Sequence, residues 1–320
     1  RESCRCWCGA ELLLLERPPT VRIAVKGKRA HSGSTMSALQ DRLAVRFRRI
    51  ITSSTDGEPP WLADVASGND LGLFNPDDAP WRVHASFTTL VGGIRALLVQ
   101  AMHPGSLAGV AQHSRYEQDA LGRLAGTTKW LTIMTFASRE AIERESARVN
   151  AMHQSVRGKY HDGKTERSYR ASDSDLLMWV HIAFTDSFLT TYQRYSGDTI
   201  DGDEYVRQHN APQSVAELER LMNEYDDVLV VSELTRRVVR FIRKPPLSRT
   251  ARIAYWWLFQ AAVASLPQSY RKRLGLRSLP LYVMEPVTRF LLRLMRLAVG
   301  QRSPLEEAAL ARRERVAAAV

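Results

Sequence analysis

Three consecutive segments decide the fold: VQAMHPGSLAGVAQHS (residues 99–114), GRLAGTTKWLTIMTF (122–136) and REAIERESARVNAMHQSVRG (139–158). Each has apolar residues at helical spacing, so each predicts a helix. In the second segment, Gly122 and Gly126 share one face beside Arg123 and Thr127, because residues four apart lie on the same side of a helix. A glycine costs a helix about 1 kcal/mol relative to alanine, so two of them indicate that something approaches the backbone closely.

The third segment carries His153 on an apolar face that it shares with Val149, Met152 and Val156. We expect this face and the glycine strip to border the same interior. A flat, apolar, anionic cofactor held by one imidazole would use all of these features. Neutral imidazole is the usual proximal ligand of haem iron, and Arg123 could pair with a haem propionate. The plainer alternative is a core histidine whose ring is hydrogen-bonded to a neighbouring carbonyl.

Helical patterns continue over most of the remaining chain, which predicts an all-α fold with a single large helical domain. Residues 176–195 are apolar almost all round and should be buried, with His181 in mid-core. Residues 159–171 are polar and loop-like, and no pair of strands is evident.

Composition divides the chain into four parts. Residues 1–35 contain all three cysteines, and we expect a disordered tail or a misassigned upstream start. Residues 36–80 should form a basic amphipathic helix (37–51) and a loop region, residues 81–300 the main helical domain, and residues 301–320 a surface helix or tail. No apolar run reaches the length of about 18 residues that a membrane span needs. Cysteine use fits a reducing, cytoplasmic compartment.

The net charge of +11 favours an anionic partner or a solvated basic surface. Basic residues occur without a helix-turn-helix or an aromatic stacking module, so we expect no nucleic-acid binding. In residues 283–299, three arginines share one face and apolar residues lie opposite: Arg289, Arg293 and Arg296 against Val287, Leu291, Leu294 and Ala298. We expect a solvated outer face over an ordinary core, with peripheral membrane contact as the alternative.

Several familiar catalytic motifs are absent from the sequence. It has no Gly-x-Ser-x-Gly elbow, no P-loop and no Gly-x-Gly-x-x-Gly after a strand. It also lacks the Glu-x-x-His pairs of a carboxylate-bridged di-iron bundle and the His-x-x-x-His of a helical zinc site.

The order of four motifs resembles the MpaB-type oxygenase family, which includes the latex-clearing protein, a rubber oxygenase. The motifs are LLVQAMHPGSLAGVAQHS (97–114), Arg123-Leu-Ala-Gly-Thr127, Met152-His153-Gln-Ser-Val156-Arg-Gly158 and Trp179-Val-His181, and the resemblance runs from about residue 80 to 299. It implies a haem b protein with a globin-like helical core. His153 would correspond to the proximal ligand, and Arg123 and Thr127 to the pair beside the haem.

The resemblance also covers His181, which matches a recurring family histidine and is the second choice for the axial ligand. One position departs from the family pattern. Latex-clearing proteins carry a lysine three residues after the arginine, and this chain has Gly126 there.

These observations lead to two hypotheses. The first is a haem b-dependent oxygenase that uses dioxygen or peroxide on a small apolar organic substrate, with His153 as the metal ligand and Arg123, Thr127 and His181 as further cofactor-binding residues. The second is a non-catalytic basic helical protein that binds lipid or a membrane surface.

Overall fold

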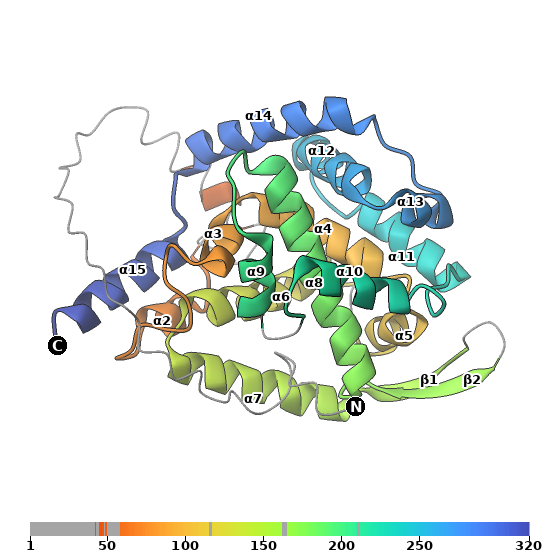
Figure 1. The fold of residues 1–320 in the computed structure, drawn as a ribbon, viewed down its shortest axis with the longest axis horizontal. Coiled ribbons are helices and arrows are strands. Elements are labelled where there is room, and N and C mark those ends of the chain that lie inside the picture. The colour runs from red at the N-terminus through yellow and green to blue at the C-terminus, as the bar shows by residue number, and fades with distance from the viewer. Residues whose placement is uncertain are drawn as a thin grey trace.

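The computed structural model describes residues 58–114, 117–161, 165–209 and 212–319, together with residues 42, 45–47 and 49. It is predominantly α-helical, which confirms the expected fold class (Figure 1). The helices are α2 (Leu62–Ala66), α3 (Ala79–Ala85), α4 (Thr88–Gln100), α5 (Pro104–His113), α6 (Ala120–Phe136), α7 (Arg139–Ser155), α8 (Ser174–Tyr195), α9 (Gly202–Gln208), α10 (Val215–Glu224), α11 (Glu233–Arg243), α12 (Arg249–Ser265), α13 (Gln268–Leu274), α14 (Leu281–Val299) and α15 (Pro304–Ala317). The expectations for residues 1–35, and for most of 36–57, lie outside the described residues.

The loop predicted for residues 159–171 was wrong. Strands β1 (Arg157–His161) and β2 (Glu166–Arg170) form an antiparallel hairpin in which Arg157 faces Arg170. Both strands are largely exposed and polar, so the alternation of apolar and polar residues that marks a strand is absent. One residue of β2, Tyr169, is buried, and its ring anchors the hairpin to the helical body.

The centre of the main core is the pair α4 and α8, which cross in the middle of the molecule (Figure 1). A Cβ atom on Gly92 of α4 would lie 2.5 Å from the ring of Phe188 on α8, so only glycine allows this close approach. The helices are also joined by an ion pair of 2.5 Å between Arg95 and Asp186. Helix α12 covers α4, and α14 packs on α12 and α8.

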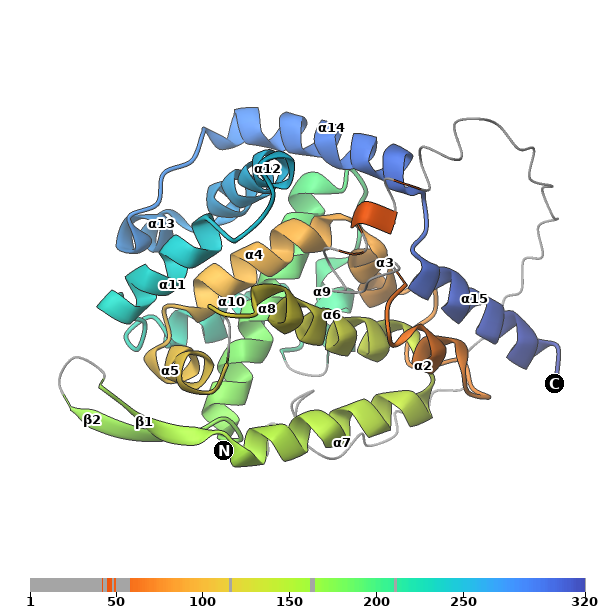
Figure 2. The same ribbon diagram turned by 180° about the vertical axis from the view of Figure 1, so that it is seen from behind.

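A second apolar cluster joins α2, α3, the C-terminal half of α6, the start of α7 and α15. The last helix, α15 in Figure 2, is therefore more than the surface helix or tail expected for residues 301–320, because it buries Leu305, Ala309 and Arg312. The guanidinium of Arg312 donates hydrogen bonds to the carbonyl oxygens of Val65 and Phe136. The small side chains of α15 allow it to approach α2 closely, and Arg312 satisfies carbonyl groups at the ends of α2 and α6.

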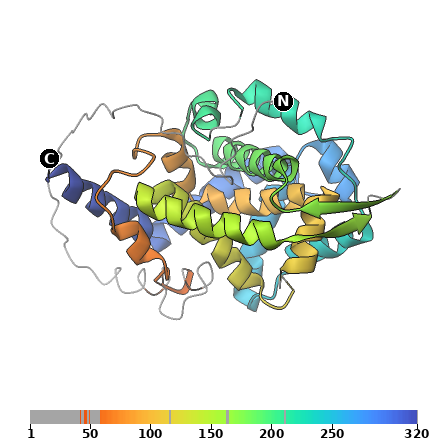
Figure 3. The same ribbon diagram turned by 90° about the horizontal axis from the view of Figure 1, so that it is seen from below.

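Helix α7 lies along one edge of the molecule and runs into the hairpin at its C-terminal end, whereas α14 forms the opposite edge (Figures 1, 2 and 3). Among the described residues, no helix is both long and apolar enough to cross a bilayer.

Candidate functional site

Helices α6 and α7 carry most of the predicted site residues and are joined by a short connection at Ala137 and Ser138. Ser138 accepts a hydrogen bond from the backbone N–H of Ala141 and so begins α7, as its position before an amphipathic segment predicts. The face of α7 formed by Ile142, Glu145 and Val149 is buried, but Met152, one turn further on, is 45% exposed. The C-terminal half of α7 is thus less covered than its N-terminal half.

Arg123, in the first half of α6, is a cation with no carboxylate partner among the described residues. Its side chain is accessible to solvent, yet desolvation lowers its pKa. Protein atoms around the side chain therefore displace part of its water although the residue is exposed. The desolvation would be offset by an anionic group bound beside it.

His153 lies close enough to Arg123 for the arginine charge to act on it. Burial lowers the pKa of His153, and the charge of Arg123 lowers it further. The imidazole is therefore neutral at pH 7, the form that binds a metal. Its Nδ1 atom is buried and has no hydrogen-bond partner in the described part of the chain. An orphaned ring nitrogen is costly and calls for an explanation, because buried polar atoms are nearly always paired.

The two glycines of α6 lie in different surroundings. A Cβ atom on Gly122 would lie 2.1 Å from Oδ2 of Asp119, the residue that caps the helix by accepting from the Gly122 N–H at 2.9 Å. The carboxylate of Asp119 fills the space beside this glycine, so the structure shows no room for a ligand there. A Cβ on Gly126 would meet no atom within 4 Å, so Gly126 does border open space. Thr127 is half-buried, and its hydroxyl donates to the Arg123 carbonyl at 3.3 Å.

A family model described as "ER-bound oxygenase mpaB/B'/Rubber oxygenase, catalytic domain" matches residues 81–299, which is more than half of the chain. The chain belongs to this family. It therefore carries an oxygenase catalytic domain, and the resemblance found in the sequence is confirmed. Comparison with curated proteins and with solved structures gave no match.

In this member of the mpaB/rubber oxygenase family, a buried carboxylate that the sequence analysis missed connects α6 to α7. Glu145 is only 4% exposed and lies 3.4 Å from Lys129 of α6 and 2.6 Å from Arg148 of its own helix. Burial acts to raise its pKa, but the two cations outweigh burial and the net shift is downward. A signal was present in the sequence, because Glu145 interrupts the apolar face that continues to Val149 and His153.

His181 lies in a second polar cluster of this oxygenase domain, between α3, α8 and α9. Its ring centroid is 6.5 Å from that of His209, and His209 Nε2 is 3.3 Å from His84 Nε2. Nδ1 of His209 is 2.6 Å from the carbonyl oxygen of Tyr205 and must donate to it, so His84 donates to His209 Nε2. Burial lowers the pKa of His181 to about 3 and that of His209 to about 4.

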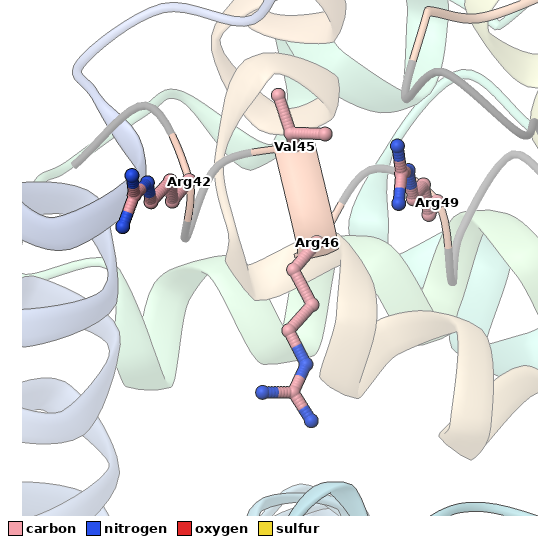
Figure 4. A pocket seen from close by; sticks show the side chains of 4 residues that line it. All are labelled: Arg42, Val45, Arg46 and Arg49. Atoms are coloured by element: carbon pink, nitrogen blue, oxygen red, sulfur yellow. The ribbon is translucent and has the colours of Figure 1, made fainter. Parts of the chain in front are cut away.

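An open concavity elsewhere is lined by Arg42, Val45, Arg46 and Arg49 (Figure 4). The three guanidinium groups point in different directions and do not converge on one point, so the geometry gives no defined anion site. Within the described ranges, no three His, Cys, Asp or Glu side chains gather into a group that could hold a metal ion.

Proposed function

We propose that this protein is a haem b-dependent oxygenase that acts with dioxygen or peroxide on a small apolar organic substrate, with His153 as the axial ligand of the iron. The observation that carries the proposal is the pair formed by His153 and Arg123: an imidazole whose buried Nδ1 has no hydrogen-bond partner among the described residues, next to a guanidinium with no carboxylate partner among them. A metal-centred macrocycle that carries carboxylates would satisfy both groups at once.

The residues around this pair fit such a group. Arg123 would hold a propionate by charge-assisted hydrogen bonds. Gly126 leaves room beside the helix, and Thr127 lies on the same part of α6. Leu124 and Met152 are 41% and 45% exposed and offer apolar surface to a flat ring. When bound, haem b supplies an iron centre that activates the oxidant, and the protein supplies the axial ligand, the propionate partner and control of access.

His153 is favoured over His181 as the ligand. His181 already lies among other buried rings, whereas His153 lies close to Arg123, which has no carboxylate partner in the described part of the chain. Gly126, at the position where latex-clearing proteins have lysine, leaves no side chain there to cap the iron. Since no cysteine occurs outside residues 4–8, a reducing compartment such as the cytoplasm suits the protein.

The test is an absorption spectrum of the full chain, purified after expression with adequate iron and haem supply. We expect an intense Soret band in the wild type, its loss in His153→Ala, and its retention in His113→Ala, a matched control because His113 is an exposed histidine of α5. Arg123→Gln should retain the band but weaken haem affinity about tenfold, the value of one charge-assisted hydrogen bond.

A correctly folded but colourless wild type would overturn the proposal in favour of the non-catalytic lipid-binding alternative. Loss of the band in His181→Ala but not in His153→Ala, with both variants shown to be folded by circular dichroism, would mean that the axial ligand is His181.

A further inference from the structure

The basic charge of the chain is concentrated in one stretch. Residues 249–302 contain ten Lys and Arg but a single acidic residue, Glu285, so this stretch carries a net charge of +9 out of +11. Glu285 is itself neutralised by an ion pair of 2.6 Å with Arg289. The stretch comprises α12, α13 and α14, and α14 forms an outer edge of the molecule (Figures 1 and 2).

The outward side of α14 is apolar, which the sequence did not predict. Residues 282, 290, 294 and 297 follow one another at helical spacing, and their exposed fractions are 80% for Tyr282, 60% for Phe290, 45% for Leu294 and 66% for Leu297. Leu294 was expected on the inner face. Arg289 is instead half-buried, where it donates to the Arg194 carbonyl at 2.7 Å. Exposed Arg293 and Arg296 flank the apolar line and have no salt bridge within the described residues.

Helix α12, which packs against α14, also exposes apolar side chains. Ile253 is 67% exposed and Trp256 is 43% exposed, and Arg249 and Arg252 are exposed near them in the first two turns. Exposed aromatic and aliphatic side chains of this size, bordered by arginines, are the composition of helices that lie in a membrane interface.

We propose that the face formed by α12 and α14 rests on an anionic lipid bilayer, with Phe290, Leu294 and Leu297 inserted among the lipids and Arg293 and Arg296 at the headgroups. Charge complementarity selects this occupant. A second copy of the chain, placed face to face on this surface, would bring two strongly basic stretches together and meet electrostatic repulsion. Anionic headgroups instead neutralise the arginines, and the bilayer buries the apolar line.

This proposal does not depend on the haem assignment, because its readout is binding to vesicles. The full chain is mixed with vesicles of phosphatidylcholine containing 30% phosphatidylserine, or of phosphatidylcholine alone, and the bound fraction is measured by flotation. Wild type should bind the anionic vesicles. Arg293→Glu/Arg296→Glu should weaken binding by at least about 30-fold, since each arginine near an anionic surface contributes about 1 kcal/mol.

The matched control for charge is Arg207→Glu/Arg237→Glu, which changes the net charge equally at exposed arginines of α9 and α11 and should bind like the wild type. Phe290→Ser/Leu294→Ser tests the apolar part and should weaken binding at least about tenfold, from the apolar area that no longer leaves water. Its control is Val228→Ser, at an apolar residue that is 42% exposed elsewhere.

Three results would overturn the proposal. The first is no binding of wild type to anionic vesicles, and the second is an equal loss of binding in the two charge variants, which would mean a non-specific charge effect. The third is a wild-type dimer in solution that Phe290→Ser/Leu294→Ser converts to monomers, which would mean that a second copy covers the face. Light scattering of the same samples measures the last of these.

Discussion

The carboxylate of Glu145 in α7 lies 3.4 Å from the ammonium group of Lys129 in α6. Glu145 is almost fully buried, whereas Lys129 and Arg148 remain in contact with solvent. The bridge lies between the vertex of the two helices and the part that carries Arg123 and His153. Glu145 therefore fixes the position of the helix that bears the proposed ligand relative to the helix that bears the proposed propionate partner.

Glu145→Ala should lower the free energy of unfolding by about 2 kcal/mol, because it removes hydrogen bonds between charged groups at a buried site while the two cations can turn to solvent. Urea denaturation measures this change. The control is Glu140→Ala on the same helix, where an exposed carboxylate pairs with Arg144 at 2.8 Å. That exposed pair should contribute less than about 0.5 kcal/mol. Equal effects of the two substitutions would show that Glu145 does not join the helices.

The two glycines of α6 should respond to alanine in opposite directions. Gly126→Ala should stabilise the cofactor-free chain by about 0.5–1 kcal/mol, because the new Cβ meets nothing and alanine favours the helix. Gly122→Ala should destabilise it by about 1 kcal/mol through loss of the Asp119 cap. The melting temperatures of the two variants test this prediction. If both substitutions raise the melting temperature, the role assigned to Asp119 is refuted.

Stability should fall as the solution is acidified below pH 6.5. Burial lowers the pKa of His84 well below its ordinary value, that of His181 to about 3 and that of His209 to about 4. These histidines favour the fold fully above the unfolded pKa of about 6.5, and this contribution is lost as the pH falls toward their folded pKa values. Below pH 6.5 these histidines bind protons in the unfolded chain but stay neutral in the folded chain.

The free energy of unfolding should therefore decrease between pH 6.5 and about 4, by up to about 1.4 kcal/mol per pH unit for each histidine. Urea denaturation at several pH values measures the slope. His209→Gln should reduce the slope of unfolding free energy against pH by the contribution of one histidine, up to about 1.4 kcal/mol per pH unit. Parallel pH profiles of wild type and variant would contradict this account.

Arg312→Met should destabilise the protein by about 2–3 kcal/mol, because the carbonyl oxygens of Val65 and Phe136 lose a buried donor. Arg315→Met on the same helix is the control, since Arg315 is exposed and bonds only to the peripheral carbonyls of Ala66 and Gly68. We expect it to cost less than about 1 kcal/mol. Similar melting temperatures for Arg312→Met and wild type would mean that these two hydrogen bonds do not stabilise the packing of α15.

The sequence predicted the long helices because their apolar periodicity is strong. It predicted the end of α7 at Gly158, but the helix ends at Ser155 because the chain turns into β1. Local patterns cannot foresee such a hairpin when its pairing partners are polar on both faces.

At the candidate site, spacing alone placed Arg123, Thr127 and His153 correctly on helices, and the proximity of Arg123 and His153 agrees with a shared interior. The role of Gly122 could not be predicted, because a glycine in the sequence does not show whether a capping side chain or a ligand occupies the space beside it. Whether Leu294 faces inward also depends on the orientation of α14, which its neighbours set.

The principal apolar core takes none of its buried residues from α7, within the part of the chain that the structure describes. If α7 supplies the axial ligand, the bundle around α4 and α8 can fold without the prosthetic group, and the group can leave and rebind while that bundle stays intact.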